Sequence, residues 1–219
     1  MVSLGPGDFE LVTLKALKAL KSSDVILVPT KSEGSFKKSL THKIVKKLFE
    51  EEKFERKLLP VFSPMKFKKE DWESQVELIM EAFWEYKSVS FVTLGDCSIY
   101  STVYYLLEII KKRDLEVFNN CEVIAGITSF SAASAKVKKP LCLGDSSLEI
   151  IPLVEKRTPK TKVYMRPKIG QFTTNLQEGG SFYTFENLFF KDENIIRGKI
   201  KEVKKYMTLF IDFFKNEKI

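Results

Sequence analysis

The sequence predicts an α/β protein made of two α/β domains with different sheets. In the first part of the chain, short apolar runs alternate with longer segments whose apolar residues recur at helical spacing. Such alternation requires crossover connections, which produce a mainly parallel sheet with helices on both faces. After Pro140 strand-like runs dominate, so the second domain is expected to contain a mixed sheet.

The elements of the first domain follow from this pattern in chain order. Each expected strand is a short apolar run, and each expected helix is a longer segment with an apolar stripe. The strands are expected at 1–4, 24–28, 56–61, 89–94 and 121–125, and the helices at 9–21, 36–53, 71–86, 98–112 and 127–136. Ligands of parallel α/β sheets bind beyond the carboxyl ends of the strands, and this chain has three glycine turns at such ends.

The second domain is expected to begin at a polar linker, Gly144-Asp145-Ser146-Ser147. The domains are therefore expected to be residues 1–143 and 144–219, with the functional site in the cleft between them. Strands are expected at 148–152, 162–166, 181–185 and 207–214, and a helix at 169–178.

The first glycine turn follows the first expected strand. Leu4 ends that strand, Gly5-Pro6-Gly7 permits a tight turn, and Asp8 can cap the helix that follows. Taken alone, a turn of this composition is equally typical of an ordinary connecting loop.

The second glycine turn, Gly95-Asp96, is the most informative feature of the chain. It lies between an apolar strand and a helix, where exposed backbone groups can bind a small polar ligand. Asp96 can bind such a ligand, cap a helix that begins at Ser98, or do both. Cys97 would then lie at a helix N-terminus, where the helix dipole can lower the pKa of a thiol, although we do not expect it to be catalytic.

The third turn repeats the pattern at Gly126. It is followed by Thr128 and Ser129 and by an alanine-rich helical segment. Three strand-to-helix turns of one type indicate one edge of one sheet, and therefore one site.

In this order and spacing, the three turns resemble those of the tetrapyrrole methylase family, enzymes that use S-adenosylmethionine to methylate corrin and siroheme precursors. The resemblance covers almost the whole chain, and it is strongest to the branch that methylates C20 of precorrin-2 or cobalt-factor II. Three details indicate this branch: Tyr100-Ser101-Thr102 after the second turn, the run from Gly126 to Ala133, and Val28-Pro29-Thr30-Lys31 ahead of Ser35.

Two positions depart from the family pattern, since Cys97 and Ala125 stand where the family generally has proline. Proline would stiffen both turns, so these changes affect the rigidity of the turns more than the ligand. The resemblance also implies that Cys97 is dispensable and that proline would be accepted in its place.

The resemblance further implies a set of site residues, with S-adenosylmethionine as cofactor and S-adenosylhomocysteine as product. The cofactor is expected to contact Pro6, Leu94, Gly95, Asp96, Ile99, Thr128, Ser129 and Met165. On sequence alone Met165 would be assigned to core packing, and only the family motif places it against the adenosine. The tetrapyrrole is expected to contact Asp8, Lys31, Ser35, Tyr100 and Arg166. No general base is identified, and Tyr104 and Tyr105 are assigned to the core or the surface.

The charge of the chain is compatible with two kinds of anionic partner. The formal net charge is +7, from 36 basic and 29 acidic residues. Nucleic acid is one candidate, but the lysines are spread along helices beside acidic neighbours, which is typical of a solvated face. The carboxylates of a tetrapyrrole are the other candidate, and we expect this partner, with no nucleic acid.

Other features place the chain in a broad class. The 3 cysteines lack metal-ligand spacing, so no metal site is expected and the thiols are expected to be free in a reducing compartment. No apolar run approaches the roughly 20 residues that span a bilayer, so a cytoplasmic protein without membrane contact is expected. The family resemblance adds the expectation of a homodimer.

Three functions therefore remain to be compared. The first is C20 methylation of precorrin-2 or cobalt-factor II in cobalamin biosynthesis. The second is methylation by the same chemistry at another ring position, or of uroporphyrinogen III. The third is non-catalytic binding of a nucleotide or RNA by a basic surface, for which the chain lacks a known motif.

Overall fold

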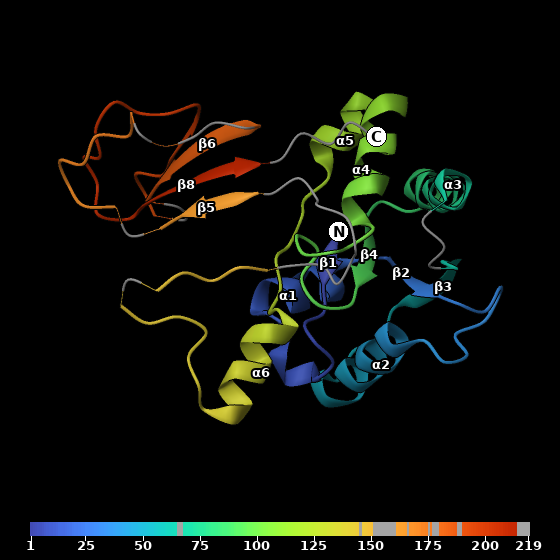
Figure 1. The fold of residues 1–219 in the computed structure, drawn as a ribbon. Helices are drawn as coiled ribbons and strands as arrows, with labels where there is room; N and C mark the ends of the chain where they lie inside the picture. The colour runs from blue at the N-terminus through green and yellow to red at the C-terminus, as the bar shows by residue number, and fades with distance from the viewer. Residues whose placement is uncertain are drawn as a thin grey trace. The chain divides into compact units, whose positions relative to one another are not determined.

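The structure is a computed structural model of the chain. It describes residues 1–64, 68–144, 146–150, 161–165, 167–174, 176, 180–187 and 190–213 (Figure 1). The contacts divide the chain into two compact units, Met1–Leu148 and Glu149–Ile219, whereas the sequence placed the boundary after residue 143.

The first unit contains a four-stranded sheet with the order β1-β4-β2-β3, in which every pair is parallel. Its strands are β1 (Val2–Ser3), β2 (Val25–Thr30), β3 (Lys57–Phe62) and β4 (Val89–Thr93). The prediction of a parallel sheet in this part of the chain is confirmed. The strand expected at 121–125 is wrong in extent, because only Ile124 forms a parallel bridge there, with Val2.

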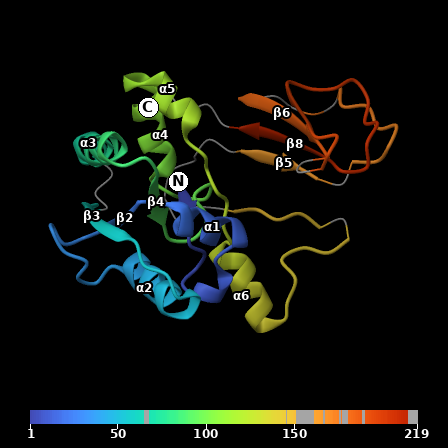
Figure 2. The ribbon, with the colours of Figure 1, turned by 180° about the vertical axis from the view of Figure 1, so that it is seen from behind.

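Helices cover both faces of this sheet, as predicted (Figures 1 and 2). The helices are the 3-10 helix η1 (Phe9–Leu11), α1 (Leu14–Ser22), α2 (Leu40–Glu52), α3 (Lys69–Glu85), α4 (Val103–Arg113), α5 (Leu115–Asn120) and α6 (Ser129–Val137). Successive residues of β2 point to opposite faces, so Leu27 packs with α3, α4 and α5 while Val28 packs with α1 and α2. The apolar residues of the strands and helices thus form two core clusters, one on each face of the sheet.

Capping side chains explain why several helices begin later than predicted. The segment 9–21 is divided because Thr13 accepts a hydrogen bond from the Ala16 N–H and starts a new helix. Ser39 caps α2 in the same way by accepting from the His42 N–H. The short helix α5 was not predicted, although Asp114 caps it.

The second unit contains a four-stranded sheet with the order β5-β8-β6-β7. Its strands are β5 (Lys162–Tyr164), β6 (Ser181–Glu186), β7 (Asn194–Arg197) and β8 (Thr208–Phe213). All described pairs are antiparallel, which corrects the expected mixed sheet. β7 was missed, since its four residues are too few to show an alternating pattern.

Two further expectations for the second unit are corrected. Residues 148–150 form no strand, and 151–152 lie outside the described residues. The described part of 169–178 is not helical, because Gly170 has a φ of 83° and its N–H donates to the carbonyl of Val203. The N–H of Thr173 likewise donates to the carbonyl of Lys201, so this segment runs beside another loop, and its own bond from the Leu176 N–H to the Thr173 carbonyl closes only a turn.

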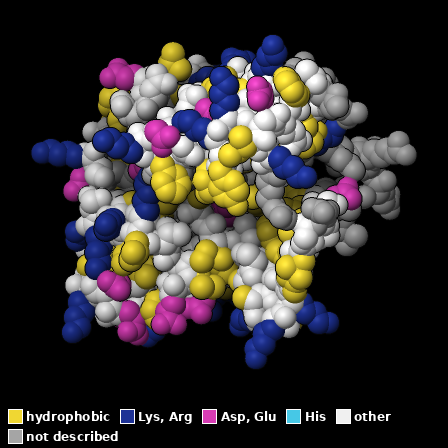
Figure 3. All heavy atoms as spheres, turned by 90° about the vertical axis from the view of Figure 1, so that its left-hand side faces the viewer, with side chains coloured by type: hydrophobic (Ala, Val, Ile, Leu, Met, Phe, Trp, Pro, Cys, Tyr) yellow, Lys and Arg dark blue, Asp and Glu magenta, His cyan; other side chains and the backbone are white. Residues whose placement is uncertain are grey.

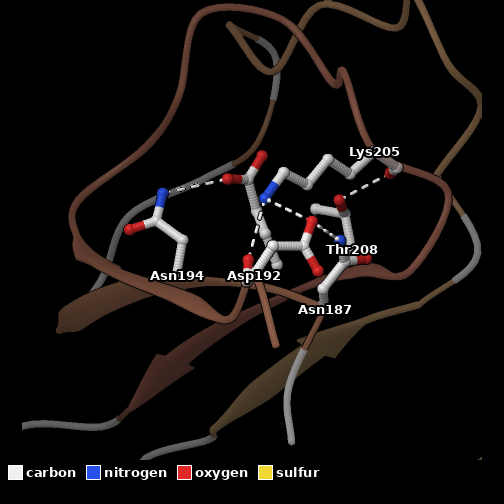
Figure 4. A network of polar contacts seen from close by, with 6 residues as sticks. Asn187, Asp192, Asn194, Lys205 and Thr208 are labelled. Atoms are coloured by element: carbon white, nitrogen blue, oxygen red, sulfur yellow. Dashed lines mark hydrogen bonds and ion pairs between the residues drawn. The ribbon is translucent and has the colours of Figure 1, made fainter. Parts of the chain in front are cut away.

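A polar network fixes the loop between β6 and β7 (Figure 4). Asn187 donates to Asp192 at 2.6 Å, and the Lys205 ammonium lies 3.3 Å from the same carboxylate. These hydrogen bonds lower the pKa of Asp192. Thr208, the first residue of β8, donates to the Lys205 carbonyl at 2.7 Å and so connects β8 to the network.

Candidate functional site

The first and second glycine turns are joined directly by their backbones. The N–H of Gly5 donates to the carbonyl of Gly95 at 3.1 Å, and the N–H of Gly95 donates to the carbonyl of Gly5 at 2.7 Å. Both residues have positive φ, 71° and 74°, a conformation that glycine adopts without strain. The pairing of β1 with β4 therefore continues into the turns and holds them together.

The third turn packs against the other two. The Ser3 N–H donates to the Ile124 carbonyl at 3.2 Å, which places the segment before Gly126 beside β1. A Cβ atom at Gly126 would lie 2.5 Å from the Ser3 Cβ and 2.7 Å from the Gly95 carbonyl oxygen. The three turns predicted to share one sheet edge therefore form one contiguous cluster, which we call the three-turn cluster.

The second turn has open space on the side where a ligand would approach. A Cβ atom added to Gly95 would meet no described atom within 4 Å. The neighbouring Leu94 side chain is 40% exposed. Backbone at this point is therefore accessible to a small molecule, in contrast to the tightly packed Gly126.

Asp96 supports the local turn and keeps part of its carboxylate free. Oδ1 accepts a hydrogen bond from the Ser98 N–H at 2.9 Å, and the Ile99 N–H donates to the Asp96 carbonyl. Its Oδ2 has no hydrogen bond with the described residues, so it remains able to accept one from a ligand. The predicted helix at 98–112 starts only at Val103, so Asp96 stabilises a turn instead of capping that helix.

Cys97 is buried, which corrects the idea of a thiol at a helix N-terminus. Its side chain is 1% exposed, and burial raises the pKa of the thiol. The Ser3 Oγ accepts from the Cys97 N–H at 3.0 Å and lies 3.1 Å from the Cys97 Sγ. Ser3 was not predicted as a site residue, yet its hydroxyl connects β1 to the second turn.

Two tyrosines follow the second turn at different positions relative to it. Tyr100 has a φ of 50° and is 68% exposed, so its ring is accessible to a ligand. Burial raises the pKa of the Tyr104 phenol, and the nearby Cys97 and Asp96 side chains raise it further when they are ionised. Tyr104 was assigned to the core or the surface, and its exposure of 48% agrees with a surface position.

The first and third turns end in side-chain caps. Asp8 accepts from the Glu10 N–H at 3.1 Å and caps η1, as predicted, while Pro6 is partly buried beside it. Thr128 caps α6 by accepting from the Ser131 N–H at 3.3 Å, and Ser129 is exposed at the first position of that helix. The caps fix where each turn ends without occupying the open side of Gly95.

The loop after β2 carries two of the predicted acceptor residues. Lys31 is exposed, and within the described residues its ammonium makes no hydrogen bond or ion pair. The loop is held in shape by Thr30, whose hydroxyl donates to the Ser35 carbonyl at 2.9 Å. β2 lies beside β4, so this loop leaves the same edge of the sheet as the second turn. Among the residues the structure describes, no hydrogen bond joins this loop to the three-turn cluster.

Two predicted residues belong to the second unit. Met165 follows β5 and is 70% exposed, so it is not part of the small core around Phe182 and Phe210. Arg166 lies outside the described residues. The contact of Met165 with the cofactor and that of Arg166 with the acceptor stay predictions.

Basic side chains are distributed over the surface among acidic ones. On the face shown in Figure 3, lysines and arginines are scattered and do not form one continuous patch. On the helices many of them pair with glutamates, as Lys47 does with Glu51 at 2.6 Å. The described residues contain no cluster of three or more metal-binding side chains and no helix long and apolar enough to cross a membrane.

Comparison with known proteins identifies sequence relatives along nearly the whole chain. The profile of the family described as Tetrapyrrole (Corrin/Porphyrin) Methylases matches residues 1–204. The chain is 32% identical over 210 residues to a protein of Methanocaldococcus jannaschii named probable cobalt-precorrin-2 C(20)-methyltransferase, covering 92% of this chain and 87% of that protein. It is 28% identical over 227 residues to the cobalt-precorrin-4 C(11)-methyltransferase of the same organism, covering 93% of this chain and 79% of that protein.

A solved structure shares the fold at low sequence identity. It is described as a putative cobalamin synthesis related protein (CobF) from Corynebacterium diphtheriae. The TM-score is 0.53 at 14% identity, and the match covers 96% of this chain and 95% of that one. The predicted α/β fold is confirmed by this likeness and by the parallel first sheet, with an antiparallel sheet in place of the expected mixed one in the second unit.

Proposed function

We propose a specific activity for this chain, which belongs to the tetrapyrrole (corrin/porphyrin) methylase family and therefore uses S-adenosylmethionine as methyl donor. The proposed activity is transfer of a methyl group to C20 of precorrin-2 or cobalt-factor II in cobalamin biosynthesis. The observation that carries this choice is the 32% identity to a probable C20-methyltransferase over 92% of the chain. The Tyr100-Ser101-Thr102 sequence after the second turn agrees with it.

The three-turn cluster fits the methyl donor. Gly95 offers exposed backbone with open space beside it, and the free Oδ2 of Asp96 can accept a hydrogen bond from an amino or ribose hydroxyl group. The proposed cofactor contacts are Pro6, Leu94, Gly95, Asp96, Ile99, Thr128 and Ser129 from the first unit and Met165 from the second.

The protein's contribution to this reaction is mainly positioning. When bound, S-adenosylmethionine supplies a methyl group that is already strongly electrophilic. The rigid turns would orient the reacting groups in a water-poor site, and positioning of this kind supplies roughly 7–11 kcal/mol in favourable cases. Cys97 is buried with a raised pKa, so it contributes to the shape of the turn and not to nucleophilic catalysis.

We further propose that acceptor carboxylates and polar groups meet Asp8, Lys31, Ser35, Tyr100 and Arg166. Lys31 and Tyr100 are exposed on the edge of the sheet that carries the turns, which supports their part in this set. A cytoplasmic homodimer without a nucleic-acid partner completes the proposal, by analogy with the family.

Two alternatives are tested with the main proposal. Methylation at another ring position is supported by the 28% identity to a C(11)-methyltransferase, and uroporphyrinogen III is a related acceptor. Binding of RNA by the basic surface is disfavoured by the scattered lysines and their glutamate partners.

One set of measurements distinguishes the three proposed functions. Thermal unfolding is followed with S-adenosylhomocysteine and with RNA, because a ligand of the folded state raises the unfolding temperature with its occupancy. The protein is then incubated with S-adenosylmethionine and with precorrin-2 or cobalt-factor II, and the product is analysed for mass and methyl position. A C20-methylated product supports the proposal. A product methylated elsewhere, or stabilisation by RNA alone, contradicts it.

A further inference from the structure

Ser3 is a fully buried residue at the end of β1, next to the three-turn cluster. Its hydroxyl is covered by the third turn, because a Cβ atom added to Gly126 would lie 3.3 Å from the Ser3 Oγ. Another pair of buried serines, Ser23 and Ser90, bond to each other at 2.7 Å near the amino ends of β2 and β4. The Ser3 hydroxyl differs from theirs because its partner, Cys97, belongs to the second turn.

Four hydrogen bonds connect Ser3, Cys97 and Ile124 in a closed ring. The Cys97 N–H donates to the Ser3 Oγ at 3.0 Å, and this hydroxyl donates to the Cys97 Sγ at 3.1 Å. The Cys97 Sγ donates in turn to the Ile124 carbonyl at 3.5 Å, and the Ser3 N–H donates to the same carbonyl at 3.2 Å. The hydrogen-bonded ring therefore joins β1, the second turn and the segment that leads into the third turn.

The hydrogen-bonded ring requires a thiol that keeps its proton. Burial raises the pKa of the Cys97 thiol, so its sulfur is protonated at neutral pH and can donate to the Ile124 carbonyl. Sulfur is a weak donor and a weak acceptor, whereas a backbone N–H and a hydroxyl oxygen are strong partners. The bond from the Cys97 N–H to Ser3 is therefore expected to contribute most to the ring.

The Cys97 N–H depends on Ser3 for its acceptor. Cys97 is 1% exposed, and in the described part of the chain no other oxygen accepts a hydrogen bond from its N–H. A buried backbone N–H without an acceptor is costly. On the other side of the turn, Gly95 is held by its two backbone bonds to Gly5. Asp96 thus lies between two anchored residues.

The same bond shows how the chain accommodates a cysteine at position 97, where the family generally has proline. Proline has no N–H, and its ring restricts its own backbone. Cysteine brings a buried N–H and a freer backbone, and the Ser3 hydroxyl satisfies the first and restrains the second. The pair of Ser3 and Cys97 can therefore hold the turn by hydrogen bonding where a proline would hold it covalently.

We propose that Ser3 is a positioning residue for binding of the methyl donor. Its hydroxyl holds the Cys97 N–H and so keeps Gly95 and Asp96 in the conformation that binds S-adenosylmethionine. Ser3 is fully buried, so it acts through the turn and not by touching the ligand. The proposal rests on the proposed function for the location of the donor at the three-turn cluster. When a turn adopts its binding conformation only part of the time, the apparent dissociation constant rises as that fraction falls.

The test is calorimetric titration with S-adenosylhomocysteine. Ser3→Ala leaves the buried Cys97 N–H without its acceptor and should weaken binding by about tenfold. In methyl-transfer assays the same variant should raise KM for S-adenosylmethionine and leave KM for the tetrapyrrole nearly unchanged. The matched control is Ser90→Ala, which removes a buried hydroxyl and its hydrogen bond at the end of β4 away from the second turn. This control should lower the unfolding temperature and keep the wild-type affinity.

A second substitution tests whether Ser3 acts through the Cys97 N–H. Combining Ser3→Ala with Cys97→Pro removes the N–H that Ser3→Ala leaves without an acceptor, so the double variant should bind more tightly than Ser3→Ala alone. A purely steric role of Ser3 would give no such recovery. Ser3→Cys takes the place of Ser3→Ala if the alanine variant does not fold, which circular dichroism reports. Its sulfur is a weaker acceptor and should weaken binding by about threefold.

Methyl transfer to precorrin-2 is measured in parallel, so the two proposals can fail separately. If wild type methylates C20 and a folded Ser3 variant binds S-adenosylhomocysteine as wild type does, the positioning role is overturned and the function stands. If wild type binds the ligand but does not methylate C20, a selective loss of affinity in the Ser3 variant still supports the positioning role. An equal loss in Ser90→Ala, a double variant without recovery, or wild type that does not bind the ligand would overturn it.

Discussion

Gly126 lies so close to Gly95 that a Cβ atom at position 126 would stand 2.7 Å from the Gly95 carbonyl oxygen. The same Cβ would stand 2.5 Å from the Cβ of Ser3, which is fully buried. These two turns are 31 positions apart in the sequence, and they can pack this closely only because residue 126 has no side chain. Close packing at this point is what makes the three turns one structure.

Gly126→Ala is therefore expected to disturb the whole cluster. Its φ is not positive, so the effect would come from overpacking, which typically costs about 1–3 kcal/mol. We expect a lower unfolding temperature together with weaker binding of S-adenosylhomocysteine. Adding Ser3→Gly should restore part of the lost stability by removing the nearest atom. Full wild-type stability of the single variant would show that the turns are less tightly packed than described.

Gly95→Val should abolish S-adenosylhomocysteine binding while the fold is retained, because the new side chain would fill the open space beside the turn. Positive φ adds backbone strain, so the control must share it. Gly34 has a φ of 62° and equally open surroundings, which makes Gly34→Val the matched variant. Calorimetric titration should find ligand binding in the control only. Equal affinity in both variants would place the cofactor elsewhere.

The position of Cys97 changes the expectation for its replacement by proline. Proline at a compatible position gains about 0.4–1 kcal/mol by restricting the unfolded chain. Here it would also remove the N–H that donates to the Ser3 Oγ at 3.0 Å, and loss of a buried hydrogen bond costs about 1–3 kcal/mol. We expect Cys97→Pro to be less stable than Cys97→Ala in chemical denaturation.

Methyl transfer should persist in Cys97→Ala, since the thiol is buried and has a raised pKa. Loss of turnover in folded Cys97→Ala protein would contradict our interpretation of this turn.

Lys31→Ala should weaken tetrapyrrole binding and leave S-adenosylhomocysteine affinity nearly unchanged. The reason is that Lys31 is exposed on the loop after β2 and has no ion-pair partner among described residues. Interactions of exposed charges are screened over about 8 Å at physiological ionic strength, so added salt should weaken acceptor binding more in wild type than in this variant. Arg166→Ala is predicted to behave in the same way.

Titration of the acceptor at several salt concentrations measures this effect. Lys18→Ala, at an exposed lysine of α1, serves as the control and should keep the wild-type salt slope. If Lys31→Ala keeps that slope too, Lys31 is not an acceptor ligand.

His42 is expected to make stability depend on pH below about 6.5, the ordinary pKa of a histidine. Burial, and secondarily the charge of Lys46, lower its pKa below the ordinary value of 6.5, and its ring stacks on Phe36 at 4.3 Å. The folded state therefore binds the proton less readily than the unfolded state. The stabilisation is complete above pH 6.5 and is lost as the pH falls from there through the folded pKa.

This histidine is the only one in the chain, so proton NMR of the folded protein should show the ring-proton resonances of one imidazole, both titrating with a midpoint below pH 6.5. Unfolding by urea should show stability falling with acidification in wild type and a flatter profile in His42→Gln. A resonance that titrates above 6.5 would reverse the predicted sign.

Local sequence patterns determined the kind of secondary structure and the elements that carry the turns. The alternation of strands and helices in the first unit was readable because the strands are short, mostly apolar runs and the helices have one apolar stripe. The glycines after successive strands indicated turns at a common sheet edge. Glycine is suited to these turns because it tolerates the positive φ that Gly5 and Gly95 adopt. The order and spacing of the three glycine turns were also enough to indicate the tetrapyrrole methylase family.

Tertiary structure alone decided which groups meet. The hydrogen bonds of Ser3 with Cys97 and the packing of Gly126 against Ser3 and Gly95 join residues distant in the sequence, for which local patterns carry no signal. The same holds for the second unit, whose antiparallel pairing depends on the register between β5, β6, β7 and β8. A strand's alternation shows that it has two faces, but only pairing with its neighbours shows which side chains combine into one surface.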